Sequence, residues 1–235
     1  METVPSLSGN FSAPSRGHRL RELHREIATC RLCVDAGLLG RAAPILPAPI
    51  PSRIVLVGQA PGRSEEAAGR PFSGRAGREL FSWLARAGVP SEEEARRRVY
   101  LTSITKCFPG PSPGGTGDRR PSSGEVALCR PYLDRQLALL APRLILPVGQ
   151  LAIDRFLPAR PLGLVVGRVF DQGGRELPAG EPLNPGHFPL LLPLPHPSGA
   201  SRWLNRPDHR ELLEQALEWL SQLLQSPWRG RAKRL

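Results

Sequence analysis

The sequence predicts a single α/β domain in which a central, mainly parallel four-stranded sheet is covered by helices on both faces, as a three-layer sandwich. Short and nearly continuous apolar runs alternate along the chain with segments of helical periodicity. This alternation is typical of parallel strands that are buried on both faces. The length of 235 residues and the hydrophobic fraction of 40% suit one globular domain with a substantial core.

Each element follows from a local pattern. The four predicted strands are Arg53–Val57, Val99–Ile104, Leu144–Val148 and Pro189–Pro195. Apolar side chains at helical spacing predict helices at His18–Thr29, Arg75–Ala87, Gly124–Leu140, Gln150–Phe156 and Asp208–Leu224. A further short strand is possible at Val165–Phe170, and residues 171–187 form an excursion rich in Gly and Pro.

The ends of the chain differ from its middle. Residues 1–17 are rich in Ser, Pro and Gly, so we expect a disordered tail there. The domain would span residues 18–226, and a basic tail, PWRGRAKRL, would follow at 227–235. Neither an apolar run of about 18 residues nor the apolar region of a secretory signal is present. We therefore expect a monomeric cytoplasmic protein of a bacterium, with no membrane partner.

The charge predicts a polyanionic partner. The net charge is +11 and the isoelectric point is about 10.9, which favours nucleic acid, here DNA in the nucleoid. Lys106 and Lys233 are the only lysines among 32 basic residues, so arginine supplies the rest. GC-rich coding is the alternative origin of this bias, but the guanidinium fork can hold a phosphate with two hydrogen bonds in either case.

The four cysteines predict a metal site. Cys30 and Cys33 form a Cys-x2-Cys pair after a predicted helix, while Cys107 and Cys129 bracket a loop rich in Pro and Gly. Disulfides are improbable in a reducing compartment, so four thiolates suggest either zinc or an iron–sulfur cluster. The alternative is a set of unrelated buried thiols. A second Cys-x2-Cys, typical of zinc ribbons, is missing, and the long second spacing fits a cluster that staples a loop.

Two polar loops leave the carboxyl ends of predicted strands. GQAPG follows the first strand from Gly58, and HPSGASRW follows the fourth from His196. In open parallel sheets, ligands bind in the crevice beyond these ends. Hydroxyls, backbone amides and a cation suited to phosphate follow at Ser198, Gly199, Ser201 and Arg202. A surface turn with a core Trp is the alternative, yet His196 is placed to donate to a charge that develops on a ligand oxygen.

Six segments in this order resemble the uracil-DNA glycosylase superfamily, especially its bacterial iron–sulfur classes of families 4 and 5. They are the Cys30–Cys33 pair, GQAPG at Gly58–Gly62, GRPFSGRAG at Gly69–Gly77, YLTSITKC at Tyr100–Cys107, CRPYL at Cys129–Leu133 and HPSGAS at His196–Ser201. The resemblance covers the chain from about Cys30 to Leu224. It implies base excision repair of DNA, in which a deaminated base such as uracil is flipped out and its N-glycosidic bond is hydrolysed.

The resemblance also implies a role for each matching residue. Phe72 would stack on the base, and His196 would donate to the base oxygen as the bond breaks. The other implied base contacts are Gly58, Ala60 and Ser103. The implied catalytic partners on the sugar side are Gln59 and Glu65. The implied DNA contacts are Ser198, Gly199, Ser201 and Arg202. The implied ligands of a [4Fe–4S] cluster are Cys30, Cys33, Cys107 and Cys129.

The chain departs from the family pattern at three positions. Neutral Gln59 replaces an acid, Arg75 stands where one iron–sulfur class has Asp, and Ser103 stands where an Asn reads the uracil edge. Ser103 cannot make the paired contacts of an amide, which predicts looser discrimination of the base. The departures favour an alternative, a catalytically silent relative that binds damaged or single-stranded DNA. A zinc-stapled DNA-binding domain is a third possibility.

Overall fold

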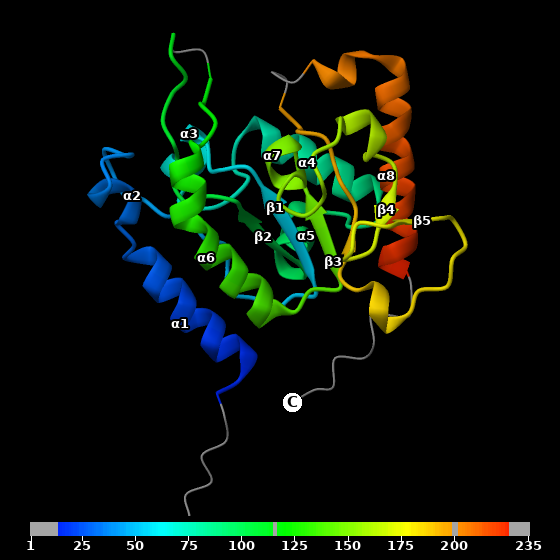
Figure 1. Cartoon of the computed structure of the whole chain (residues 1–235), viewed down its shortest axis with the longest axis horizontal. Coiled ribbons are helices and arrows are strands. Elements are labelled where there is room, and N and C mark those ends of the chain that lie inside the picture. Colours follow the sequence, from blue (N-terminus) through cyan, green and yellow to red (C-terminus); the bar gives the residue numbers. More distant parts are fainter. Residues whose placement is uncertain (1–13, 115–116, 199–201, 226–235) are drawn as a thin grey trace, which may run out of the picture.

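The computed structural model describes residues 14–114, 117–198 and 202–225. Its sheet has six strands in the order β2-β1-β3-β6-β4-β5 (Figure 1). The parallel strands are β1 (Ile54–Gly58), β2 (Val99–Ser103), β3 (Leu144–Pro147) and β6 (Leu190–Leu191). Two antiparallel strands follow at one edge, β4 (Val169–Phe170) and β5 (Glu176–Leu177). The predicted α/β class is confirmed, but the count of four strands was wrong by these two.

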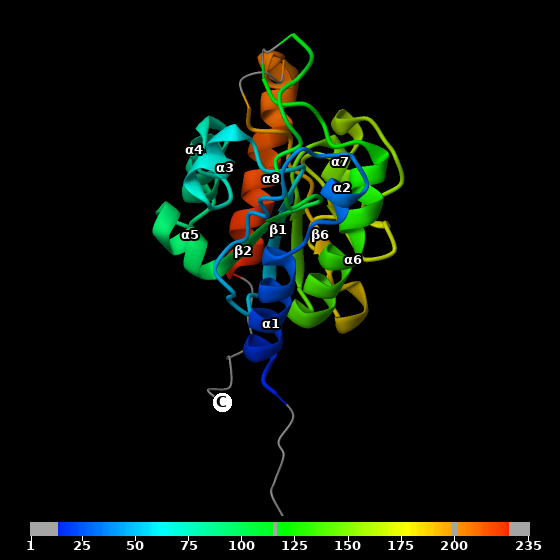
Figure 2. The same cartoon turned by 90° about the vertical axis from the view of Figure 1, so that its left-hand side faces the viewer.

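Helices cover both faces of the sheet, as the end-on view in Figure 2 shows. On one side lie α3 (Arg63–Ala68), α4 (Arg75–Arg86), α5 (Glu92–Arg98) and α8 (Pro207–Gln225). On the other side lie α1 (Arg16–Ala28), α2 (Leu32–Asp35), α6 (Ser123–Leu140) and α7 (Gln150–Ile153). Short 3₁₀ turns occur at Leu162–Leu164, Pro185–His187 and Trp203–Asn205.

The residues of β1 explain why the strands are apolar throughout. Ile54 and Leu56 pack into the core formed with α4, α5 and α8, while Val55 and Val57 pack into the core formed with α1, α6 and α7. Successive side chains of a strand point to opposite faces. Because both faces are covered, all five residues of β1 are buried.

The helix α1 begins earlier than the sequence predicted. The side chain of Ser15 caps it by accepting a hydrogen bond from the backbone N–H of His18 at 3.2 Å, as N-cap serines do. Arg16 and Gly17 therefore belong to the helix, and the predicted tail of residues 1–17 is too long by at least these two. Residues 1–13 and the predicted basic tail at 227–235 lie outside the described residues.

The strand order places a topological switch point beside β1. The chain leaves β1 for β2 on one side and returns past β1 to β3 on the other. The carboxyl ends of β1 and β3 therefore diverge into connections on opposite faces, which leaves a crevice at that edge. This edge is uppermost in Figure 1, below the extended segment that precedes α6. Across the described ranges, no helix has the length and apolar character needed to cross a membrane.

Candidate functional site

A cavity of about 350 Å³ opens at the carboxyl ends of the strands. This volume falls in the range of about 300–1,000 Å³ that is usual for small-molecule sites. Its lining includes eight of the residues predicted for the site: Gly58, Gln59, Ala60, Glu65, Phe72, Ser103, His196 and Ser198. Arg202 is exposed and is not part of the lining. Gly199 and Ser201 lie outside the described residues.

One wall of this cavity depends on a glycine. A Cβ atom at Gly58 would come within 2.9 Å of Cζ and 3.4 Å of Cε1 of the Phe72 ring. Carbon atoms do not approach so closely, so residue 58 must lack a side chain for the ring to lie where it does. Gly58 thereby allows the half-buried Phe72 to present a flat aromatic face beside the end of β1.

The backbone of Phe72 is held in an unfavourable conformation. Its φ of +54° lies in the left-handed region, which a bulky residue rarely adopts. Arg96 donates to the carbonyl oxygens of Pro71 and Phe72 at 2.9 and 3.2 Å, and a Cβ atom at Gly77 would overlap the Phe72 carbonyl. Strained residues persist where their surroundings fix them, and they cluster at functional sites.

Glu65 fastens the loops on either side of Phe72. One carboxylate oxygen accepts hydrogen bonds from the backbone N–H groups of Ser73 and Gly74, both at 2.8 Å, and the other accepts from Gly62 N–H at 2.9 Å. A carboxylate engaged by three backbone amides is a rigid structural element. The structure therefore gives Glu65, predicted as a catalytic residue, a clear role in positioning the pocket loop.

His196 lies at the opposite side of the sheet's switch point, after β6. The backbone N–H of Ser198 donates to its Nδ1 at 3.2 Å, and the hydroxyl of Ser198 lies 2.9 Å from the same nitrogen. A backbone N–H can only donate, so Nδ1 accepts and the neutral ring carries its proton on Nε2. Burial lowers the pKa of His196 below its usual value, which favours this neutral form.

The hydroxyl proton of Ser103 is already used in a hydrogen bond within the protein. It donates to the carbonyl oxygen of Thr105 at 2.7 Å, and Ser103 is buried at the end of β2. A hydroxyl has a single proton and two lone pairs. Ser103 therefore faces the cavity as an acceptor. Among the described residues, none makes a hydrogen bond with the side-chain amide of Gln59, which remains available to a ligand or water.

Two charged residues of the lining were missed by the sequence analysis. Asp118 and Arg119 enter the cavity wall from the segment between the third and fourth cysteines. An Asp118 oxygen accepts from Arg63 N–H at 3.3 Å, while Arg119 makes two hydrogen bonds to the buried Glu125 at 2.8 and 2.6 Å. The cysteines could have indicated this placement. If Cys107 and Cys129 share one site, the segment between them must fold back toward the sheet.

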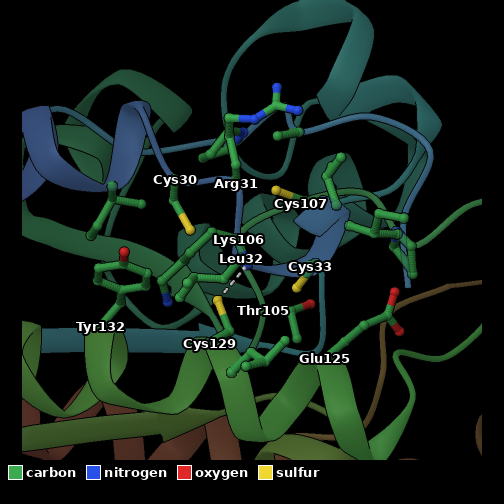
Figure 3. A pocket seen from close by; sticks show the side chains of 17 residues that line it. Cys30, Arg31, Leu32, Cys33, Thr105, Lys106, Cys107, Glu125, Cys129 and Tyr132 are labelled. Atoms are coloured by element: carbon green, nitrogen blue, oxygen red, sulfur yellow. Dashed lines mark hydrogen bonds between the residues drawn. The ribbon is translucent and has the colours of Figure 1, made fainter. Parts of the chain in front are cut away.

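A second cavity is lined by the four cysteines. Figure 3 shows the sulfur atoms of Cys30, Cys33, Cys107 and Cys129 turned toward one space. Backbone N–H groups point at two of them: Lys106 N–H lies 3.3 Å from Cys129 Sγ, and Ala43 N–H donates to Cys107. Within the described ranges, no three His, Cys, Asp or Glu side chains are close enough to share one metal ion.

The chemistry of these thiols fits a cationic centre. Burial raises the pKa of Cys33 and that of Cys107 to about 11, and the neighbouring thiolates add to both shifts. Burial also raises the pKa of Cys129. These shifts keep the thiols protonated at neutral pH, and a bound cation would favour the deprotonated forms that act as ligands. Thiols with raised pKa values are poor nucleophiles, so the set suits metal binding rather than catalysis.

The fold and the first cavity define a class of protein: a three-layer α/β protein with a pocket at the switch point of its sheet, lined by an aromatic ring and an imidazole. The sequence model of the uracil DNA glycosylase superfamily matches residues 47–221. The chain belongs to this superfamily, as the resemblance predicted.

Individual relatives agree with this assignment. The Type-4 uracil-DNA glycosylase of Pyrobaculum aerophilum is 34% identical over 156 residues, which are 64% of this chain and 74% of that protein. The Type-4 uracil-DNA glycosylase of Archaeoglobus fulgidus is 36% identical over 133 residues, or 57% of this chain and 61% of that protein. A Type-5 uracil-DNA glycosylase of Pyrobaculum aerophilum is 29% identical over 149 residues, or 57% of this chain and 63% of that protein.

Proposed function

We propose that this protein is a DNA N-glycosylase that flips uracil, or another deaminated base, out of DNA and hydrolyses its N-glycosidic bond. The observation that carries the proposal is one cavity that combines the Phe72 face, the buried acceptor of Ser103 and the neutral imidazole of His196. The superfamily and the printed names of the relatives support the same activity.

Base binding would use Phe72 and Ser103. An extruded base stacks on the flat ring of Phe72, since aromatic faces bind any base through its π-surface. The Ser103 oxygen accepts a hydrogen bond from an N–H on the edge of the base, because its own proton is donated to Thr105. Uracil and hypoxanthine both present such an N–H, so one acceptor selects deaminated bases less sharply than the two contacts of an amide.

His196 would stabilise the leaving base. When the glycosidic bond breaks, the bonding electrons leave with the base and negative charge grows on its oxygen. The Nε2–H of His196 donates to that oxygen, while Ser198 N–H holds Nδ1 at 3.2 Å and fixes the tautomer. A neutral donor placed in advance stabilises the anion without having to reorganise.

The sugar side would rely on Gln59. The sugar becomes positively charged in the transition state, and a water must attack it from the face opposite the base. The side-chain amide of Gln59, which pairs with no described residue, lines the cavity beside the end of β1 and can orient this water. Glu65 holds the loop through three backbone amides, and its negative charge lies in the same wall.

DNA binding would surround the mouth of the cavity. Ser198 lies beside His196, and the exposed Arg202 follows; Gly199 and Ser201 complete the proposed loop for phosphates and the minor groove. The net charge of +11 predicts binding that weakens steeply with salt, because released counterions drive it. We retain a monomer as the proposed state.

We propose that Cys30, Cys33, Cys107 and Cys129 hold a [4Fe–4S] cluster. Zinc needs four sulfurs within about 2.3 Å of one point. Among the described residues, no three His, Cys, Asp or Glu side chains are grouped to hold a single ion, so the proposal is supported by the cavity that the four cysteines share and by the superfamily. When bound, the cluster supplies covalent links that fasten α2, the end of β2 and α6 together. The hydrolysis itself uses the residues of the first cavity.

The test is release of free base from oligonucleotides that contain uracil, hypoxanthine, xanthine or a thymine mismatch. We expect release of uracil, and we expect His196→Ala to lower its rate by about 10²–10³. Phe72→Ala should lower it as well. Normal rates in both variants would remove the proposed roles.

A second function is favoured by one specific observation. Gln59 is neutral and Arg75 stands next to the loop, so the chain lacks the acids of its family pattern at both positions. A silent relative that binds damaged or single-stranded DNA would bind the same oligonucleotides in a salt-sensitive manner and release no base from any of them.

A further inference from the structure

Lys106 occupies an unusual place between the two cavities. It follows β2, precedes Cys107, and is only 1% exposed. Its ammonium group donates to Thr102 Oγ1 at 3.1 Å and, over a short distance, to the carbonyl oxygen of Ser103. Figure 3 shows its side chain among the cysteines. The residue therefore touches the cysteine site and the base-reading end of β2 at once.

The charge of this buried ammonium is not balanced by an acid. Both of its hydrogen-bond acceptors are uncharged, and no carboxylate lies within 4.0 Å of it in the part of the chain that the structure describes. The nearest acid of the cysteine cavity, Glu125, is paired with Arg119 instead. An uncompensated buried charge is strongly unfavourable. A negative group close to Lys106 would stabilise its charged form.

The cysteine site provides that negative charge. Lys106 and the four cysteines line the same cavity, and Figure 3 shows the Lys106 side chain close to that of Cys129. Four thiolates around a [4Fe–4S] core carry a net negative charge. The geometry thus joins a buried cation to a buried anionic group, with one backbone N–H to Cys129 Sγ at 3.3 Å between them.

A chain of buried hydrogen bonds continues from Lys106 into the fold. Thr102 Oγ1 donates to Gln136 Oε1 at 3.2 Å, and Gln136 Nε2 donates to the hydroxyl of Tyr100 at 2.7 Å. That hydroxyl then donates to Nε2 of His24, also at 2.7 Å. The bonds follow one another without a break, and a connected buried network of this kind fixes side-chain positions.

The network connects the elements that carry the cysteines. Gln136 lies on α6, the helix of Cys129, and His24 lies on α1, which ends just before Cys30. Thr102 and Ser103 are the last residues of β2. The cluster site and the reading edge of the pocket are therefore two ends of one rigid polar assembly.

We propose that Lys106 is the internal counter-ion of the cluster and that its bond to the Ser103 carbonyl makes the shape of the base pocket depend on the cluster. The role rests on the proposed cluster and glycosylase function. Lys106 is a positioning residue, since it acts on the base through Ser103.

The experiment measures the cluster and the pocket separately in the purified holoprotein. Lys106→Met removes the charge and keeps the bulk. We expect the reduction potential of the cluster to become more negative, because an adjacent positive charge stabilises the reduced form. We also expect iron loss to a chelator to become about 10- to 100-fold faster, as for other outer-shell partners of metal sites. Thr102→Val keeps the charge but breaks the network, so it should leave the potential unchanged and speed amide exchange at Ser103.

Arg31→Met is the matched control. Arg31 also lines the cysteine cavity, but its side chain is 64% exposed and lies 3.6 Å from Asp35. Water screens an exposed charge, so this variant should shift the potential much less than Lys106→Met. Equal shifts in the two variants, or a wild-type potential in Lys106→Met, would overturn the counter-ion role.

Two further outcomes remain informative. If Lys106→Met does not fold, amide exchange of the wild-type protein with and without its cluster replaces it, and unchanged protection at Ser103 and Thr105 would contradict the coupling. A brown protein that releases no uracil would refute the catalytic proposal alone, because the potential is read without turnover. A colourless, iron-free protein would refute both the cluster and the role of Lys106.

Discussion

The ring of Phe72 lies so close to Gly58 that a single methyl group at residue 58 would come within 2.9 Å of it. The position of this aromatic face in the pocket thus depends on the lack of a side chain at residue 58 on β1. Because the ring edge is the part that would be displaced, the cheapest response to a larger residue is a movement of Phe72 toward the cavity.

Gly58→Ala should therefore impair catalysis while leaving the fold intact. We expect the KM for uracil-containing DNA to rise and kcat/KM to fall by about tenfold, since one displaced contact of about 1.4 kcal/mol has that effect. Steady-state release of uracil gives the measurement. Gly40→Ala is the control, because a Cβ atom there meets no other atom within 4 Å and the backbone is unstrained. An unchanged kcat/KM in Gly58→Ala would show that the Phe72 ring can move aside without loss of activity.

Glu65→Gln should reveal a structural carboxylate. An amide can accept with one oxygen only, so at least one of the three backbone N–H groups at Gly62, Ser73 and Gly74 loses its acceptor. We expect a loss of about 1–3 kcal/mol in the free energy of unfolding, together with slower uracil release. Denaturant unfolding and kinetics on the same sample test this. A stable variant with no activity would instead assign Glu65 a direct part in catalysis.

The pH dependence of catalysis should report a neutral His196. Burial lowers the pKa of this imidazole below its usual 6.5, so the neutral donor persists from pH 8 down through pH 6.5. We expect kcat for uracil release to be flat over that window and to decline only at lower pH, as the ring becomes protonated and loses the Ser198 N–H bond. Single-turnover kinetics across pH 5–8 are suitable. An acid limb with an apparent pKa of 7 or more would contradict this assignment.

His24 should make the fold sensitive to acid. Burial, assisted by the charge of Lys106, lowers the pKa of His24 to about 4. Between pH 6.5 and about 4 the unfolded chain binds a proton at this residue and the folded chain does not, so stability falls as the pH falls through that window. We expect a His24→Gln variant, which can still accept from Tyr100, to lose less of its Tm over the same range. Thermal unfolding at half-unit intervals of pH gives the difference, and parallel curves for the two proteins would refute it.

The sequence predicted β1, β2 and β3 closely because each is covered on both faces, so every residue of these strands is buried. The predicted strand Pro189–Pro195 was too long, because β6 comprises only Leu190–Leu191. Other elements left no such signal. The helix α5 buries only Ala95 and is held by ion pairs one turn apart, such as Arg96 to Glu92 at 2.8 Å. Strands β4 and β5 have two residues each, too few for any periodicity.

The residues of the site that belong to short sequence motifs could be predicted, and the others could not. Gly58 and His196 line one cavity, as expected from their positions after predicted strands, and Phe72, which the family resemblance indicated, lines it too. Asp118 and Arg119 did not, because their place in the cavity wall depends on how a long segment folds back between two cysteines. The fastening role of Glu65 was equally hidden, since three backbone amides from two separate turns have no sequence signature.

The left-handed backbone of Phe72 has a consequence for how this position can change over evolutionary time. Glycine adopts this conformation freely, but here a large phenylalanine adopts it. Phe72 therefore depends on Arg96 and Gly77, which fix its carbonyl group, and a change at either of them would affect residue 72. A residue better suited to this φ would relax the backbone, but it would remove the aromatic face proposed to stack on the base. The position therefore combines a conformational cost with a proposed role in binding.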